Sequence, residues 1–399
     1  MSWEKVPIKD VCEGIYDGPH ATPPLSESGA IFLGIQNFKN GRLDFSDVRY
    51  ISEEDLLIWT KRVIPQAGDI VFSYEATLNL YAIIPAGFRG CLGRRMALIR
   101  VDKNKINYRY LYYYLHSPTW KAVIAENTVT GATVDRIPLI RFPDFEIELP
   151  PLDVQNNIAD ILSAYDDLIE NNQRQIKLLE EAAMRLYREW FVFMRFPGHE
   201  SVRIVDGVPE GWEKKKVSSI MKFVKGKNLG DVSFEKLDGY EKLLLLDGLE
   251  SDVTTYGCAE KQVLAKDGDI LMLMDGARSS HTFITDAGIV GSTLSLIEIT
   301  ENQIPVSYVK GYFDANLNLF VNNNTGSAIP HANRKFIEGS DILIPNLQLL
   351  ENYDNISGVF LKRVRSLNHM NQQLRISRDA LLPRLMNGGE GLKLEGGAV

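Results

Sequence analysis

The stretch that decides the fold is residues 158–193, IADILSAYDDLIENNQRQIKLLEEAAMRLYREWFVF, which carries an apolar stripe along its whole length. The spacings within the stripe alternate between three and four residues, as in a helix that pairs with another helix. Its members are Leu162, Tyr165, Ile169, Asn172, Ile176, Leu179, Ala183, Leu186, Trp190 and Phe193. Only Asn172 is polar. We predict a helix from about Leu152 to Phe193, on the order of 60 Å long.

A second stripe of the same kind lies near the carboxyl end of the chain. Its members are Phe360, Val364, Leu367, Asn371, Leu374, Arg378, Leu381 and Leu385. Read outward from Asn172 and Asn371, the two series of spacings match only when the helices run in opposite directions. Each stripe could instead cover only its own domain, but sustained heptads favour an antiparallel coiled coil.

The matching spacings also predict the register of the pair, with Asn172 opposite Asn371. The other layers are Ile176 with Leu367, Leu179 with Val364, Ala183 with Phe360, Ile169 with Leu374, Tyr165 with Arg378, Leu162 with Leu381 and Ile158 with Leu385. A buried amide pair lowers stability but penalises slipped registers, because a slip leaves each amide without its partner.

The rest of the chain is a long tandem duplication, found by searching for ordered repeats. The repeated anchors are Trp3-Glu4-Lys5 with Trp212-Glu213-Lys214, Gly68-Asp69-Ile70 with Gly268-Asp269-Ile270, Tyr110-Leu111 with Tyr308-Val309, and Thr130-Gly131-Ala132 with Thr325-Gly326-Ser327. In each copy, β-branched and aromatic runs bounded by Gly, Pro and Asn predict strands. These runs are 69–73, 81–84, 97–101, 269–273 and 293–299. Segments 108–116 and 308–313 have helical spacing. We predict an α+β fold of two homologous mixed domains, joined by the helices and related by an approximate two-fold axis.

Length and composition agree with more than one core. The chain has 399 residues and 45% hydrophobic residues, and it lacks the run of roughly 18 apolar residues that a membrane span needs. Its first ten residues lack a secretory signal, so we expect a cytoplasmic protein. Cys12, Cys91 and Cys258 are far apart in the sequence and from the histidines, which predicts buried thiols and no disulfide or metal site.

Charge and motifs limit the possible functions. A net charge of −8 means that any site for a polyanion must come from local clustering or from a partner subunit. The common phosphate-binding, dinucleotide-binding, zinc-protease and amino-methyltransferase signatures are missing, so we assign no catalysis. A hydrolase that uses Glu53 and Asp55 is an alternative, but Ser52-Glu53-Glu54-Asp55 is typical of a helix start.

The ordered duplication resembles the specificity (S) subunit of type I restriction-modification enzymes over almost the whole chain. The resemblance rests on the repeated anchors, on Ile147 to Gln155 leading into the first helix, and on residues 381–388, LLPRLMNG. The start of the second helix departs from the family pattern at Leu350-Glu351-Asn352. The resemblance implies a noncatalytic subunit with two target recognition domains, each reading one half of a bipartite, asymmetric site in double-stranded DNA.

The resemblance also implies domains and partners. The expected parts are recognition domains at 1–151 and 197–346, conserved helices at 152–196 and 347–388, and a flexible tail at 389–399. The helices would set the unread gap and bind two methyltransferase (modification) subunits, which bring S-adenosylmethionine, and restriction or motor subunits can join. The competing hypothesis is a coiled-coil adaptor whose domains bind proteins and read no DNA.

Candidate DNA contacts combine turn residues with side chains that can bind bases or phosphates. In the first domain they are Tyr16, Asp17, His20, Arg94, Arg95 and Arg136. In the second they are Lys225, Lys227, Asn228, Arg278, Ser279 and His331. The alternative for each of these residues is that it only belongs to a solvated loop or a surface ion pair. The duplicated Thr130-Gly131 and Thr325-Gly326 are more typical of framework turns.

Overall fold

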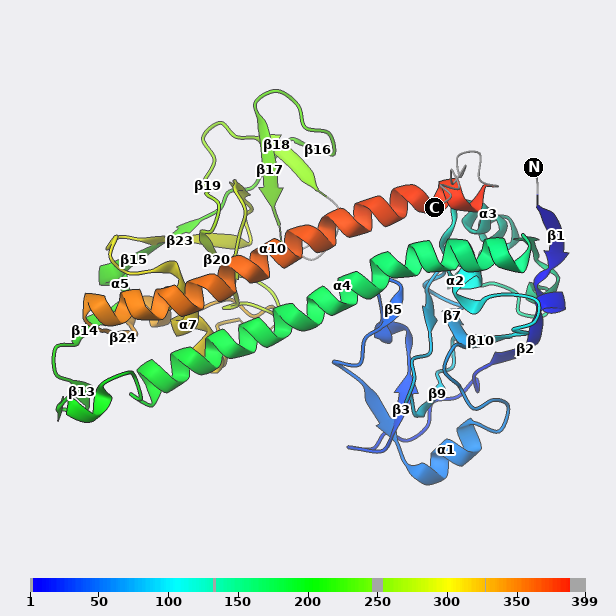
Figure 1. Ribbon diagram of the computed structural model, residues 1–399, viewed down its shortest axis with the longest axis horizontal. Coiled ribbons are helices and arrows are strands. Elements are labelled where there is room, and N and C mark those ends of the chain that lie inside the picture. Colours follow the sequence, from blue (N-terminus) through cyan, green and yellow to red (C-terminus); the bar gives the residue numbers. More distant parts are fainter. Residues whose placement is uncertain (1–2, 132–133, 246–253, 327, 388–399) are drawn as a thin grey trace, which may run out of the picture. The chain divides into compact units, whose positions relative to one another are not determined.

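The computed structural model describes residues 3–131, 134–245, 254–326 and 328–387 (Figure 1). Ala132 and Ser327 of the duplicated anchors, Gly388 and the predicted tail at 389–399 lie outside the described residues. The chain divides into two compact units, one of Met1–Asp167 with Ile376–Val399 and one of Leu168–Arg375.

A four-stranded antiparallel sheet, in the order β2-β10-β7-β8, is the centre of the first unit. Its strands are β2 (Cys12–Asp17), β7 (Ile70–Ser73), β8 (Tyr81–Ile83) and β10 (Met96–Val101). Strand β7 is buried along its whole length, which explains its apolar run Ile70–Phe72. The strands predicted at 69–73, 81–84 and 97–101 are therefore confirmed.

The remaining elements of the first unit surround this sheet. Strand β3 (Ala30–Leu33) joins β6 (Arg49–Ile51) and β9 (Gly90–Leu92) in a three-stranded sheet, while β1 (Glu4–Pro7) pairs with β11 (Glu146–Leu149) and β4 (Phe38–Lys39) with β5 (Arg42–Leu43). The helices are η1 (Ile8–Val11), η2 (Ile35–Asn37), α1 (Glu53–Trp59), α2 (Tyr108–His116), α3 (Pro118–Asn127) and η3 (Phe142–Asp144).

Two of these helices test local sequence predictions. Helix α2 has the bounds predicted for 108–116 and buries Tyr110, Leu111 and Tyr114 in the core. Helix α1 begins after Ser52, whose Oγ accepts a hydrogen bond from the Asp55 backbone N–H at 3.0 Å. The interpretation of this segment as a helix start is confirmed.

The second unit repeats the central sheet, in the order β15-β23-β20-β21. Its strands are β15 (Met221–Lys225), β20 (Ile270–Leu273), β21 (Thr282–Ile284) and β23 (Leu294–Ile299), and β14 (Glu213–Lys216) pairs with β24 (Asp341–Ile344) as β1 pairs with β11. The strands predicted at 269–273 and 293–299 are confirmed. The helix predicted at 308–313 lies within α7 (Val306–Ala315).

The second sheet of this unit has five strands, in the order β16-β18-β17-β22-β19. They are β16 (Val232–Ser233), β17 (Tyr240–Leu244), β18 (Thr255–Cys258), β19 (Leu264–Ala265) and β22 (Gly288–Val290). Figure 1 shows β16, β17 and β18 extending beyond the four-stranded sheet. The other elements are η4 (Arg188–Val192), η5 (His199–Ser201), β12 (Ile204–Val205), β13 (Val208–Pro209), α5 (Val217–Ile220), α8 (Leu317–Asn322) and α9 (Arg334–Gly339).

Two long helices contribute to both units, α4 (Leu152–Tyr187) and α10 (Leu347–Met386). The α-helical part of α4 ends earlier than predicted, because a π-helical turn at Arg188–Val192 follows Tyr187. Helix α10 begins beside Asn346, whose Oδ1 accepts a hydrogen bond from the Leu349 backbone N–H at 2.9 Å. This amide cap supplies a start signal where the family pattern at Leu350 is lost.

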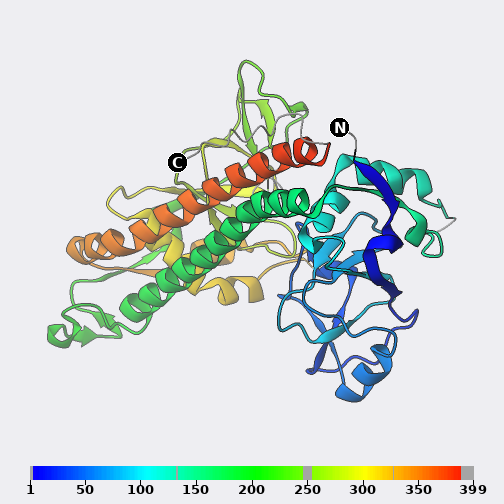
Figure 2. The ribbon, with the colours of Figure 1, turned by 45° about the vertical axis from the view of Figure 1, so that its right-hand side comes forward.

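Within the second unit α4 and α10 lie side by side and antiparallel (Figures 1 and 2). Asn172 of α4 hydrogen-bonds to Asn371 of α10. In the π-helical turn that follows α4, 18 residues after Asn172, the Trp190 ring contacts Tyr353, which lies 18 residues before Asn371 in α10. In the first unit, Ile158 and Leu162 of α4 share one core with Leu381 and Leu385 of α10. The predicted α+β fold with an antiparallel helix pair is confirmed within each unit.

The cysteines differ from the prediction at one position. Cys91 is buried and Cys12 is partly buried, and burial raises the pKa of both thiols to about 12. Cys258, the last residue of strand β18, is exposed. The prediction of a buried thiol is wrong at Cys258. No helix among the described residues is both long and apolar enough to cross a membrane.

Candidate nucleic-acid interface

One edge of the four-stranded sheet carries the candidate residues of the first unit. Because β2 and β7 both run antiparallel to β10, their carboxyl ends lie beside the amino end of β10. Asp17 ends β2, Tyr74 and Glu75 follow β7, and Arg94 and Arg95 precede β10. The fold therefore gathers side chains that are up to 78 positions apart in the sequence.

Asp17 is the centre of this edge. Its carboxylate pairs with the Arg62 guanidinium and lies 3.0 Å from His20 Nε2. His20 Nδ1 lies 3.4 Å from the hydroxyl of Tyr74. The structure thus brings together Asp17 and His20, which were predicted, and Arg62, which was not.

Tyr74 holds the turn that carries Arg94. Its hydroxyl donates a hydrogen bond to the Arg94 carbonyl oxygen at 2.9 Å, and the Arg94 side chain is exposed. Burial, followed by the nearby carboxylates of Asp17 and Glu75, raises the pKa of Tyr74 to about 12. Tyr74 therefore stays a protonated donor at neutral pH, and the turn keeps its hydrogen bond.

The other first-unit candidates have structural partners as well. Arg95 Nε lies 3.4 Å from Glu75 Oε1, and the backbone of Arg136 bridges to Glu75 and Val129 while its side chain is exposed. Tyr16 is half-buried against a small core under the sheet and is therefore placed as a packing residue. Arg94, Arg136 and His20 are the predicted side chains best exposed to a ligand.

The second unit has the same edge with different side chains. Asp275, which follows β20, lies 2.7 Å from His331 Nδ1 and 3.9 Å from Lys225 Nζ at the end of β15. Arg278 lies over the Phe283 ring, 5.3 Å from its centroid. The structure therefore brings Lys225 and His331 together around one carboxylate.

Ser279 does not belong to the exposed set. It is fully buried, and its Oγ accepts a hydrogen bond from Asn324 Nδ2 at 2.8 Å, while Asn324 Oδ1 accepts from Ser280. This bonding ties the turn after β20 to the segment after α8. Burial corrects the predicted role of Ser279, because a side chain without exposed surface cannot contact DNA in this conformation.

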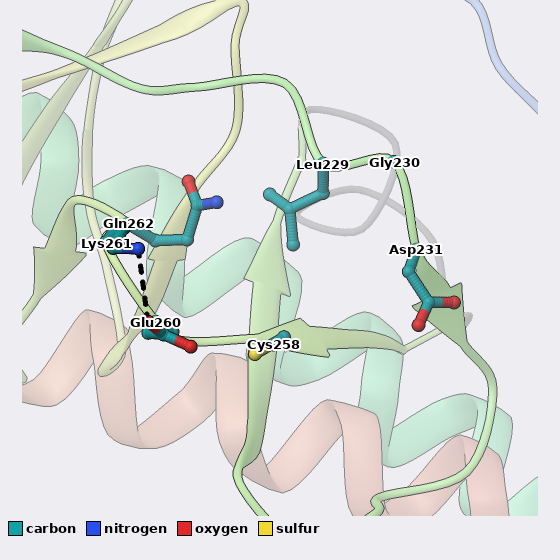
Figure 3. Close-up of a pocket in the computed structure, with 7 residues that line it drawn as sticks. All are labelled: Leu229, Gly230, Asp231, Cys258, Glu260, Lys261 and Gln262. Carbon is teal, nitrogen blue, oxygen red and sulfur yellow. Dashed lines mark ion pairs between the residues drawn. The ribbon is translucent and has the colours of Figure 1, made fainter.

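Lys227 and Asn228 directly precede a segment that lines a hollow, Leu229–Asp231. Lys227 Nζ donates a hydrogen bond to the Lys261 carbonyl oxygen at 2.6 Å, and the Asn228 side chain is exposed. The hollow has a volume of about 290 Å³. Figure 3 shows that its lining residues come from two segments of the five-stranded sheet region. Its lining residues are Leu229, Gly230, Asp231, Cys258, Glu260, Lys261 and Gln262. The sequence alone did not single out this hollow.

The helix pair contains the residues that were expected to define its register. Asn172 Nδ2 donates to Asn371 Oδ1 at 2.9 Å, and both side chains are almost fully buried. Of the other predicted register residues, Ile169 and Leu367 are buried, and Ile176, Leu179 and Leu374 are partly buried. The two amides are thus paired between apolar neighbours of the stripes, Ile169, Ile176, Leu367 and Leu374.

A polar network that the sequence did not indicate lies further along the pair, in the first unit. Arg378, which was predicted to face Tyr165, pairs with the next residue, and its Nη1 lies 2.5 Å from Asp166 Oδ1. Asp166 also accepts a hydrogen bond from the Tyr113 hydroxyl at 2.6 Å, and its carbonyl oxygen accepts one from Arg42. Burial acts to lower the pKa of Arg378, but Asp166 outweighs it and the pKa is raised.

The site residues offer no obvious metal centre. Among residues 3–131, 134–245, 254–326 and 328–387, no three His, Cys, Asp or Glu side chains gather closely enough to hold a metal ion. The chemistry of both sheet edges is instead that of cationic side chains and imidazoles held by carboxylates. Such groups bind phosphates and the edges of bases.

Comparison with known proteins identifies the class. A family model described as type I restriction modification DNA specificity domain matches residues 1–181. The chain is 25% identical over 358 residues to the type I restriction enzyme MjaIX specificity subunit of Methanocaldococcus jannaschii, covering 85% of this chain and 81% of that protein. It is 27% identical over 190 residues to the MjaVIII specificity subunit of the same organism, covering 44% of each.

The fold agrees with a solved structure of the same class. The S subunit of a type I restriction-modification system from M. genitalium superimposes with a TM-score of 0.59 at 14% identity, covering 97% of this chain and 96% of that one. Residues 1–181 thus match the type I restriction modification DNA specificity domain, and over most of its length the chain is similar to the specificity (S) subunit of a type I restriction enzyme.

Proposed function

We propose that this chain is the specificity (S) subunit of a type I restriction-modification system, its noncatalytic DNA specificity member, and that each of its units reads one half of a bipartite, asymmetric site in double-stranded DNA. The recognition domains are proposed at 1–151 and 197–346, with the helical regions 152–196 and 347–388 connecting them. The observation that carries the proposal is the repeated sheet edge. Arg94, Arg136 and His20 in one unit, and Lys225 and His331 in the other, are presented from the same part of a duplicated frame.

The two units place different side chains at the same position of the same sheet, which supports a different base sequence in each half-site. The backbone N–H of Gly18 donates to the Met96 carbonyl at 2.8 Å, and that of Gly226 donates to the Leu294 carbonyl at 2.9 Å. Asp17 and Lys225, which precede these glycines, therefore occupy corresponding positions but have opposite charges. Donor and acceptor groups of opposite kind select different base edges in the major groove.

The helices are proposed to set the unread gap between the half-sites and to bind two methyltransferase subunits. Those subunits would supply S-adenosylmethionine and methylate adenine after flipping it out of the duplex. Restriction or motor subunits can join the same core. Surfaces of these partners would also offset the net charge of −8 of this chain around DNA.

Methylome sequencing tests the proposal directly. A host that expresses this chain with its two methyltransferase subunits should acquire N6-methyladenine in one bipartite motif with unequal halves. A matched host that lacks only this chain should have no such motif. Full assembly without any bipartite motif would favour the protein-binding adaptor.

Lengthening both helices tests the role of the helices in spacing. Four residues inserted after Gln173, with four more inserted before Met370, keep the antiparallel layers paired and add about 6 Å. That length is close to two base pairs at about 3.4 Å each. The methylated motif should keep both halves and gain a longer gap, and an unchanged gap would contradict the proposed spacing role.

A further inference from the structure

Arg62 is not among the DNA contacts proposed above, yet it is held at the centre of the first unit's sheet edge. It lies in the segment between α1 and β7, and its Nη1 pairs with Asp17 Oδ1 at the end of β2. Its side chain is 54% exposed, whereas the Asp17 side chain is 26% exposed. The carboxylate is therefore the sheltered member of the pair and the guanidinium is the presented one.

The pair is poorly suited to a purely stabilising role. Exposed ion pairs contribute little to stability, because water screens them and ordering a long side chain costs entropy. An arginine held by a carboxylate is, however, restricted before any ligand arrives, and such restriction sharpens recognition. The contact with Asp17 uses one terminal nitrogen of a group that has five N–H donors.

The residues around Arg62 also fit a side chain that contacts a base. Asp17 lies 3.0 Å from His20 Nε2, and Tyr74, which lies 3.4 Å from the other ring nitrogen, fixes the turn that carries the exposed Arg94. Arg62 is thus part of one surface with two predicted contact residues. A planar guanidinium on such a surface can donate two parallel hydrogen bonds to guanine O6 and N7.

We propose that Arg62 reads a guanine in the major groove of the first half-site and that Asp17 is its positioning residue. This proposal rests on the proposed function. It is confined to the first half-site, because Lys225 occupies the place of Asp17 in the second unit and pairs there with Asp275.

The test uses the complete complex of this chain with its methyltransferase subunits. Its readouts are the methylated motif and binding to oligonucleotides substituted at each position of the site. The wild type should discriminate for one guanine of the first half-site by roughly 5- to 100-fold. Arg62→Lys and Arg62→Gln should reduce that discrimination to less than about threefold and leave the second half-site unchanged. Lys keeps the charge but cannot form the fork, so it separates base reading from phosphate binding.

Arg89→Gln is the matched control. Arg89 also forms an exposed pair with a carboxylate, Glu53, in the same unit. This variant should keep the motif and the discrimination. Asp17→Asn should weaken discrimination at the same guanine and at no other position, whereas general damage to the fold would weaken every position.

Two results would overturn the proposal. One is that Arg62→Lys keeps the motif while Arg62→Gln weakens all sequences equally, which would make Arg62 a phosphate contact. The other is that both variants bind and methylate as the wild type does. If the wild-type complex produces no bipartite motif at all, the proposed function fails, which is a separate outcome.

Discussion

The two units share a framework but differ in the sheet beside it. Both central sheets have the same strand order, whereas the neighbouring sheet has three strands in the first unit and five in the second. Even there a parallel pair is common to both, β3 with β9 and β17 with β22. The comparison teaches that the buried strands and their connections are kept, while edge strands and the side chains at the sheet edge vary.

The shared turn before β7 and β20 shows what holds the framework. Gly68 and Gly268 have φ angles of +92° and +88°, and their backbone N–H groups donate to Ile84 and Thr285 across the sheet. Asp69 Oδ2 and Asp269 Oδ2 each accept a backbone hydrogen bond at 2.7 Å from the residue three positions earlier. A glycine followed by an aspartate is therefore required by backbone geometry in both units.

The largest difference that can be tested is the charge network of the first unit. In the second unit, α4 and α10 meet through aromatic rings, including Tyr187 and Tyr353. In the first unit, Asp166→Ala would leave Arg378 and the Tyr113 hydroxyl without their buried acceptor. We expect unfolding free energy to fall by about 3–5 kcal/mol in urea titrations.

Asp167→Ala is the control for this experiment. Asp167 is the next residue and its side chain is 63% exposed, paired with Arg109 at 3.5 Å. Its loss should cost less than about 1 kcal/mol. Equal losses for the two variants would show that the Asp166 network does not stabilise the unit.

The next effect concerns the amide pair in the second unit. Asn172→Leu leaves the buried Asn371 amide without its partner, which should cost about 1–3 kcal/mol. Adding Asn371→Leu should raise the thermal midpoint above that of the wild type but broaden the distribution of registers. Calorimetry measures the change in thermal midpoint. Cysteine crosslinking across the helix pair measures the distribution of registers. A double variant no more stable than the single one would contradict this account.

The shared turns offer a smaller and symmetric test. Gly68→Ala and Gly268→Ala should each cost about 1–2 kcal/mol, because alanine is strained at positive φ. No steric clash adds to this cost, since the nearest atoms to an added Cβ lie 3.9 and 4.0 Å away. Gly230→Ala, which meets no atom within 4 Å, should be nearly neutral. Markedly different losses of unfolding free energy for the two variants would show that the two turns are not equivalent.

The smallest effect is an acid sensitivity of the second unit. Burial acts to raise the pKa of Asp286, but the hydrogen bond and charge of His369, the charge of Lys242 and the hydrogen bond from Arg365 outweigh it, so the pKa is lowered. A lowered pKa in the folded state adds stability above the unfolded value, about 3.9, and that stability is lost as pH falls below it.

Asp286→Asn should therefore flatten the fall in stability below about pH 4 and lower stability slightly at pH 7. Stability is measured in urea titrations from pH 3 to 7. Glu260→Gln, an exposed carboxylate of the same unit, serves as the control. A pH profile of Asp286→Asn that matches the wild type would exclude Asp286 as a contributor.

The sequence predicted the repeated elements well, because their signals are local. Strand β7 and helix α2 follow from apolar runs and helical spacing, and the antiparallel direction of α4 and α10 follows from the order of spacings around Asn172 and Asn371. In the five-stranded sheet, β16 and β19 could not be predicted, because they have only two residues each. A strand that short has no periodic pattern to detect.

The candidate interface was only partly predictable, and particular residues show why. Lys225 and His331 were selected for their chemistry, and so was Ser279, which is fully buried. Arg62 was missed because its partner Asp17 is 45 positions away and neither position has a distinctive neighbourhood in the sequence. The domain bounds and the individual DNA contacts stay predictions until the motif is known.

By itself, the sequence determined the duplication, the class of fold and the direction of the helix pair, because spacing and order along the chain encode these features. Only the tertiary structure decided which side chains share a sheet edge and which carboxylate holds which cation. Those contacts join residues from different strands and turns, and their distances depend on how the backbone closes and not on separation along the chain.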